Sequence, residues 1–155
     1  MKILILAVGK VAGPERDLCA RYTERALKLG RQIGISGLTV TELADRVGPT
    51  RAADEGAALI AKAPKGPLIA LDERGKGVSS EGFANALQAK LDAGKSTITF
   101  AIGGADGHPP AVRERASEIL SLSPMTLPHQ LARVTLLEQI YRAITLCAGH
   151  PYHRS

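Results

Sequence analysis

Short apolar runs alternate with amphipathic segments along the chain. Five runs have the length and the apolar or β-branched content of buried strands, at residues 2–8, 38–43, 67–71, 96–102 and 119–122. Segments with helical spacing follow them, at residues 13–29, 51–63, 80–94, 110–117 and 128–147. Because strands and helices alternate, the pattern predicts an α/β fold in which helices cover both faces of a mostly parallel sheet.

The length of the chain fits a single domain that spans residues 1–155. A folded chain of this size buries roughly 70% of the surface that its unfolded form exposes, so a sizeable core is possible without disulfide staples. The sequence contains no internal repeat, low-complexity run or linker. We therefore expect no second domain.

The composition is globular and slightly basic. Hydrophobic residues make up 45% and charged residues 23%, and 20 Lys and Arg against 15 Asp and Glu give a net charge of +5. A positive surface favours polyanionic partners at long range, although solubility explains the charge equally well. The 3 Tyr and 2 Phe are too scattered for a base-stacking sheet. An RNA partner would therefore be contacted through phosphates, shape and a pocket for one base.

The sequence carries no signal for export or membrane insertion. The apolar run at residues 3–8 is too short for a typical secretory core and is closed by Gly9 and Lys10. No stretch approaches the length of a membrane span. Cys19 and Cys147 are too few for a disulfide framework. We expect a cytoplasmic protein without a membrane partner.

Three segments of the later chain follow predicted strands and are candidates for a ligand site. They cover residues 71–76, 102–107 and 122–127. Ligands of open α/β sheets bind beyond the carboxyl ends of the strands, so one pocket built from these three segments is the natural hypothesis. The pair Gly103-Gly104 permits close approach of the backbone to a ligand, but a tight turn uses such a pair as often.

The nucleotide and metal motifs are missing. Gly75-Lys76 is followed by Gly77, which excludes a P-loop, and no G-x-G-x-x-G follows the first strand. Cys147, His150 and His153 form a ligand set too sparse for structural zinc. We expect no metal.

The last predicted helix carries an apolar stripe with a spacing of three and four residues, from Leu131 to Cys147. Such a stripe packs in the core or against a second subunit, and the periodicity alone does not separate the two. Arg133 and Arg142 lie among these residues. They either anchor a carboxylate or phosphate or belong to a solvated face.

The sequence as a whole resembles a known family, the bacterial 23S rRNA pseudouridine N3-methyltransferases of the SPOUT class. The matching segments are residues 1–10, 71–76, 79–83, 100–107, 122–130, 138–143 and 150–154. The combination of Thr126-Leu-Pro-His129 with the closing His150-Pro-Tyr-His-Arg154 is highly specific. The resemblance spans the whole chain, although residues 34–67 match only in pattern.

The resemblance implies a SPOUT-type α/β knot, in which the C-terminal part of the chain forms a trefoil knot that binds S-adenosylmethionine. Trefoil knots are among the rare exceptions to the rule of unknotted chains. Two subunits are expected to pair so that each completes the other's site. The implied cofactor contacts are Leu71, Gly103, Gly104, Leu122, Ser123, Pro124, Met125, Thr126 and Leu127. Pro124 has no N–H, so backbone donors for the adenine would have to come from its neighbours.

The implied reaction is methylation of N3 of a pseudouridine in the 23S rRNA of the assembled ribosome. A ring N–H is a weak acid, so a nearby base or cation would assist the transfer. His153, together with Tyr152 and Arg154, is the first candidate for this role, and Arg142 and His129 are further candidates. A purely structural role for His129 at the helix start fits equally well. The alternative function is a non-catalytic RNA- or ribosome-binding module of the same fold.

Overall fold

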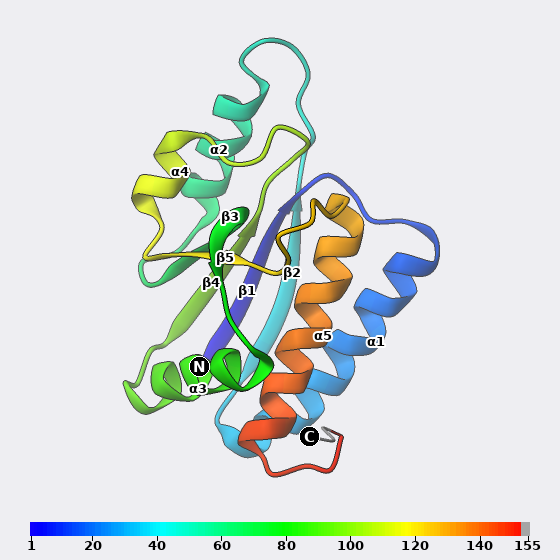
Figure 1. Cartoon of the computed structure of the whole chain (residues 1–155), viewed down its shortest axis with the longest axis vertical. Helices are drawn as coiled ribbons and strands as arrows, with labels where there is room; N and C mark the ends of the chain where they lie inside the picture. Colours follow the sequence, from blue (N-terminus) through cyan, green and yellow to red (C-terminus); the bar gives the residue numbers. More distant parts are fainter. Residues whose placement is uncertain (153–155) are drawn as a thin grey trace.

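A computed structural model describes residues 1–152 and contains one sheet in which every strand is parallel to its neighbours. The strand order is β2-β1-β4-β3-β5 (Figure 1). The strands are β1 (Lys2–Val8), β2 (Gly37–Leu43), β3 (Leu68–Gly77), β4 (Thr97–Ile102) and β5 (Glu118–Ser121). The predicted parallel α/β sheet is confirmed.

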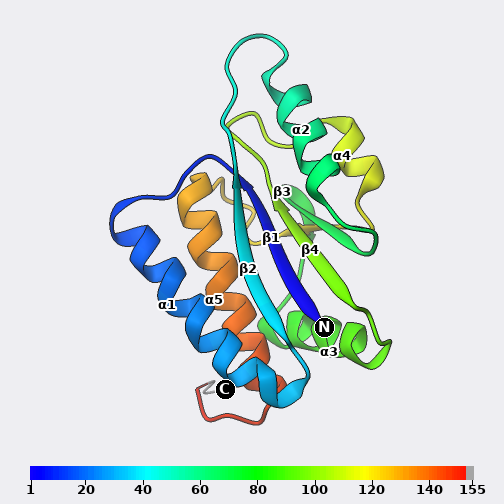
Figure 2. The same cartoon turned by 180° about the vertical axis from the view of Figure 1, so that it is seen from behind.

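Helices cover both faces of the sheet, as the alternating pattern predicts. One face carries α1 (Gly13–Gly30), α3 (Ser80–Asp92) and α5 (His129–Cys147), and the other carries α2 (Arg51–Lys62) and α4 (Pro110–Arg115). Figures 1 and 2 show the two layers from opposite sides. A short 3₁₀ turn at Arg31–Ile33, which the pattern did not predict, extends α1.

The sheet separates two hydrophobic cores, one on each face, and neighbouring residues of a central strand pack into opposite cores. Ile3 and Ile5 of β1 pack into the core under α1, α3 and α5, whereas Leu6 and Val8 pack into the core under α2 and α4. All four side chains are at most 1% exposed. A strand that is buried on both sides has no polar face, which explains why β1 reads as an unbroken apolar run.

Strand β3 is longer than predicted. The sequence predicts a strand at residues 67–71 and a loop at residues 72–77, whereas β3 extends to Gly77 with a shift of register between Leu71 and Lys76. Leu120 of β5 pairs with both of these residues. The charges and glycines of this segment are typical of a loop, and only its pairing with a strand more than 40 residues away makes it part of the sheet.

The second half of β3 crosses over β5. A Cβ atom at Gly75 would come within 2.8 Å of backbone atoms of Ile119 and Leu120, closer than a real side chain allows. Figure 1 shows the green β3 passing in front of the yellow β5. The crossing therefore requires glycine at this position, and it brings the segment after Leu71 beside the segment after β5.

Candidate functional site

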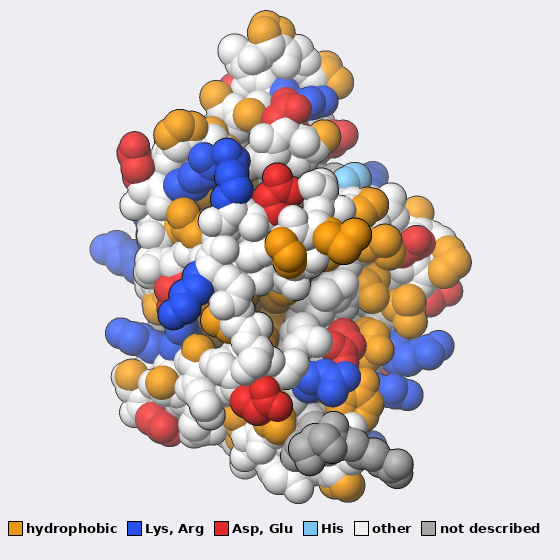
Figure 3. Space-filling model, in the orientation of Figure 1, with side chains coloured by type: hydrophobic (Ala, Val, Ile, Leu, Met, Phe, Trp, Pro, Cys, Tyr) orange, Lys and Arg blue, Asp and Glu red, His pale blue; other side chains and the backbone are white. Residues whose placement is uncertain are grey.

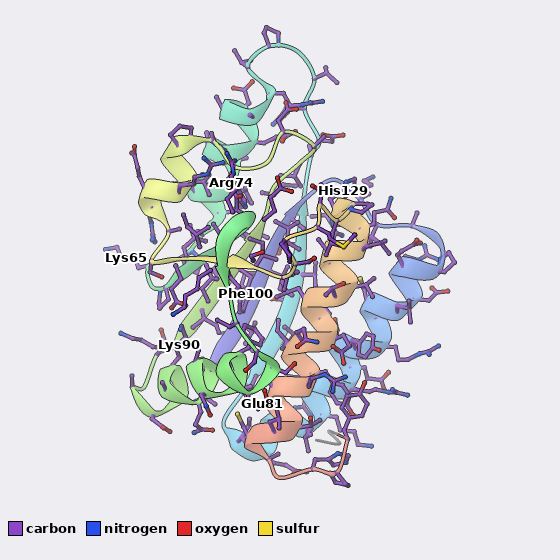
Figure 4. The ribbon with its side chains drawn as sticks, in the orientation of Figure 1. Lys65, Arg74, Glu81, Lys90, Phe100 and His129 are labelled. Atoms are coloured by element: carbon purple, nitrogen blue, oxygen red, sulfur yellow. The ribbon has the colours of Figure 1, made fainter. Side chains whose placement is uncertain are left out.

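A cavity of about 580 Å³ lies beside the middle of β3 and at the carboxyl ends of β4 and β5. All three segments that the sequence selected contribute to its wall. The lining residues are Leu71–Arg74, Ile102–Gly107, Leu122, Ser123, Thr126–His129 and Ala132. Figure 4 labels Arg74, which belongs to β3, and His129 at the start of α5. The structure therefore gathers the three segments into one site.

Most of the predicted cofactor contacts line this cavity, and two do not. Leu71, Gly103, Gly104, Leu122, Ser123, Thr126 and Leu127 are in its wall. Pro124 and Met125 are outside it, and Met125 is 75% exposed. The reason is a tight local fold: the N–H of Met125 donates to Oγ of Ser123 at 2.9 Å, which turns both residues towards the surface.

Three glycines of the loop between β4 and α4, residues 103–107, place backbone atoms in the cavity wall. The N–H of Gly107 donates to the carbonyl oxygen of Gly104 at 3.0 Å, and Gly107 has a positive φ of +71°. A Cβ at Gly103 would come within 3.0 Å of the Gly107 backbone. The Gly103-Gly104 pair therefore forms a tight turn that also lines the cavity, and the close approach of a ligand to its backbone stays a prediction.

Charged residues at the cavity were not singled out from the sequence. Asp72, whose side chain is 7% exposed, forms ion pairs with Arg113 at 3.0 Å and Arg74 at 3.2 Å. Burial alone would raise the pKa of Asp72, but the N–H of Arg74 and the two guanidinium groups outweigh it and lower the pKa. Glu73 and Asp106 lie in the predicted segments but were given no role there, and Ala132 lies outside those segments. Charged residues in predicted loops are usually exposed to solvent, so their charge alone does not indicate a site. The only signal in the sequence for the acids and Arg74 is their position in segments that follow predicted strands.

The N-terminal end of α5 closes another side of the cavity. His129 lines it and lies against Gly9, since a Cβ at Gly9 would be 3.3 Å from Nε2 of His129. One turn later, Arg133 is completely buried and donates to Glu42 at 2.5 Å and to the carbonyl oxygen of Gly9 at 2.9 Å. Arg133 therefore anchors a carboxylate of its own chain.

Two other catalytic candidates, Arg142 and Tyr152, lie towards the opposite end of α5. Arg142 forms an ion pair with Glu138 at 2.7 Å, and its guanidinium carbon lies 5.4 Å from the centroid of the Tyr152 ring. The Tyr152 ring also packs on Tyr141, with a centroid distance of 4.6 Å. Thirteen residues of helix separate Arg142 from His129, which corresponds to about 20 Å along the axis. His153 and Arg154 lie outside the described residues.

Comparison with known proteins decides the family. The family described as "Predicted SPOUT methyltransferase" matches residues 1–153. Two relatives are named "Ribosomal RNA large subunit methyltransferase H". The one from Xanthobacter autotrophicus is 48% identical and the one from Rhodopseudomonas palustris 50% identical, and in both cases the match covers 100% of each chain. The chain belongs to the SPOUT methyltransferase family.

A solved structure agrees with this assignment at the level of the fold. The crystal structure of a probable methyltransferase from Bordetella pertussis Tohama I superposes with a TM-score of 0.50 at 16% identity, and the match covers 92% of this chain and 95% of that one. The cavity of this SPOUT methyltransferase thus lies in a fold that is shared by distant proteins.

Residues 1–152 lack two features, a membrane-spanning helix and a metal-binding cluster. No helix in this range is long and apolar enough to cross a bilayer. The same residues contain no group of three His, Cys, Asp or Glu side chains that could hold a metal ion.

Proposed function

We propose that this SPOUT methyltransferase transfers a methyl group from S-adenosylmethionine to N3 of a pseudouridine in 23S rRNA of the assembled ribosome. The observation that carries the proposal is the cavity, which unites the three predicted segments. The printed names of the full-length relatives support ribosomal RNA as the substrate.

The cavity fits S-adenosylmethionine in size and in lining. Its volume of about 580 Å³ lies within the range of roughly 300–1,000 Å³ that is typical of small-molecule sites. Leu71, Ile102, Leu122 and Leu127 offer apolar surface for an adenine ring, and Gly103 lets the ligand approach the backbone. The bound donor would supply an already activated methyl group. The task of the chain is then to hold the two reactants in line and to exclude water.

Removal of the proton from the ring nitrogen is assigned to the C-terminal residues. We propose His153, Tyr152 and Arg154 for this step, with Arg142 and His129 as further candidates. Arg142 is held by Glu138 and lies beside the Tyr152 ring, so Arg142 and Tyr152 already form one cluster. A cation there would stabilise the negative charge that develops on the base.

We also propose a homodimer, and the separation of this cluster from the cavity supports it. Within one chain Arg142 is about 15 Å along α5 from Ala132 in the cavity wall, so a second subunit would have to bring its own cluster to the site. Exposed apolar side chains support such pairing: Met125 is 75% and Leu131 45% exposed. Figure 3 shows hydrophobic side chains gathered over the upper part of α5 and the segment before it.

The crossing of β3 over β5 supports the trefoil knot that the family resemblance implies. Because the proposed substrate is ribosomal, we also propose that the protein acts in the cytoplasm.

Two measurements test the proposed function. Isothermal titration with S-adenosylmethionine should show binding, and purified ribosomes from cells that lack the gene should accept labelled methyl groups only when the protein is added. Binding of ribosomes without any methyl transfer would instead identify the alternative, a non-catalytic module.

Subunit mixing tests the shared site. Ala105→Trp fills the cavity from an exposed lining position, and His153→Ala removes the first catalytic candidate. Each variant alone should be inactive. Heterodimers of the two should regain activity, because one of their two sites receives an intact cavity and an intact tail. Heterodimers as inactive as either parent would contradict the shared site.

A further inference from the structure

Helix α2 lies on the sheet face opposite α5, and two of its side chains reach the loop at residues 103–107. Arg51 forms a two-bond fork with Asp106: Nε lies 2.9 Å from Oδ2, and Nη2 lies 2.6 Å from Oδ1. The side chains of Arg51 and Asp106 are 30% and 49% exposed. The loop is therefore tied to a helix that contributes no residue to the cavity wall.

Glu55, one turn further along α2, lies directly behind Gly104. Glu55 is only 2% exposed, and its Oε1 accepts a hydrogen bond from the N–H of Arg46 at 3.0 Å. Among the described residues Oε2 has no hydrogen-bond partner, and it is the nearest atom to the position that a Cβ of Gly104 would take. Burying a carboxyl group is costly, so its place behind the loop calls for a functional explanation.

A glycine-rich loop is costly to order when a ligand binds. Gly103 and Gly104 have a large conformational freedom in the unsupported chain, and freezing them on binding would reduce the affinity. Within the loop, one hydrogen bond joins Gly107 to Gly104. The fork from Arg51 restrains this loop at Asp106, and Glu55 packs against it at Gly104, so both act from outside the loop before any ligand arrives.

We propose that Arg51 and Glu55 are positioning residues that hold the 103–107 loop in the conformation that binds the methyl donor. The proposal rests on the proposed function, because it assumes that S-adenosylmethionine occupies the cavity. Neither residue is a catalytic residue, since neither lines the cavity.

A double-mutant cycle tests the fork. Arg51→Ala and Asp106→Ala should each weaken S-adenosylmethionine binding by about two- to fivefold, the size expected for a partly exposed ion pair. The double variant should bind no more weakly than the weaker single variant. Asp54→Ala is the matched control, because Asp54 lies on the same helix and bonds only to Thr50 among the contacts of its side chain that the structure records. Unchanged affinity of Arg51→Ala, or losses that multiply in the double variant, would overturn the role of Arg51.

A pair of variants tests Glu55. Glu55→Gln keeps the shape of the side chain and can still accept the N–H of Arg46, so its affinity should stay near that of the unmodified protein. Glu55→Ala removes the support and should weaken binding. Melting temperatures measured without ligand separate this effect from lost stability: a variant that melts earlier but binds equally well would show a purely structural role and overturn the proposal. If the unmodified protein itself fails to bind S-adenosylmethionine, the proposed function fails instead.

Discussion

The hydroxyl of Thr126 donates a hydrogen bond of 2.5 Å to the carboxylate of Glu73. The two residues are 53 positions apart in the sequence, and both line the cavity. Their bond joins the segment after β5 to the segment where β3 begins to cross over β5. The wall of the site is thus closed by a contact that only the crossing makes possible.

Loss of this bond should weaken binding of the methyl donor. Thr126→Val keeps the shape of the side chain but removes the hydroxyl, and a lost hydrogen bond of about 1 kcal/mol corresponds to roughly fivefold in affinity. Thr126→Ser retains the hydroxyl and is the control. Titration calorimetry with S-adenosylmethionine measures both variants. Equal affinity of Thr126→Val and Thr126→Ser would show that the bond does not support the site.

At the crossing of β3 over β5, alanine should destabilise the fold in place of Gly75 but not in place of Gly77. A Cβ at Gly75 would press on backbone atoms of β5 at 2.8 Å, whereas a Cβ at Gly77 would meet no atom within 4 Å. We expect Gly75→Ala to lower the free energy of unfolding by about 2–3 kcal/mol, because a backbone cannot give way like a side chain. Gly77→Ala should change it by less than about 1 kcal/mol. Urea unfolding that ranks the two variants equally would contradict the crossing.

Parts of this site could be predicted from the sequence, and the reason is geometric. Carboxyl ends of parallel strands meet at one edge of a sheet, so residues 71, 103 and 122 could be brought together from the strand pattern alone. The crossing could not be predicted, because the charged segment from Asp72 to Lys76 is loop-like in its local composition. Its pairing with Leu120 depends on contacts distant in sequence.

The contacts of single charged residues were equally hidden from the sequence. Arg133 and Arg142 lie nine residues apart on one helix and look alike in the sequence. Only the fold shows that Arg133 is buried against Glu42 while Arg142 stays partly exposed beside Tyr152. Long charged side chains find partners in other elements, which periodicity does not encode.

Removal of the buried guanidinium should cost stability. Arg133→Met keeps an apolar stem, but it leaves the carbonyl oxygen of Gly9 without this donor and leaves Glu42 with only the N–H of Val11 among the described donors. Because the Glu42 side chain is 34% exposed and can regain water, we expect a loss of about 2–3 kcal/mol, below the value for a fully buried pair. Arg16→Met, at a side chain 70% exposed, is the control and should be nearly neutral. A loss no larger than that of the control, measured by urea unfolding, would contradict the anchoring role.

Asp72 should make stability depend on acid pH. Burial alone would raise its pKa, but the N–H of Arg74 and the guanidinium groups lower the pKa below the ordinary value of 3.8. A carboxyl group with a lowered pKa stabilises the folded state above its unfolded pKa and loses this contribution as the pH falls through the folded pKa. Asp72→Asn should therefore be less stable than the unmodified protein at neutral pH, and the difference should shrink below pH 3.8. A difference that is constant with pH would mean that the charge of Asp72 contributes nothing.

The central claim is that the cavity at the β3–β5 crossing serves methylation of ribosomal RNA, and mass spectrometry of 23S rRNA tests it most directly. The rRNA is taken from cells that lack the gene and from the same cells complemented with the unmodified protein or with Ala105→Trp. The account predicts one N3-methylated pseudouridine that disappears with the gene, returns with the unmodified protein and does not return with Ala105→Trp. An rRNA methylation pattern that is the same in all of these cells would contradict it.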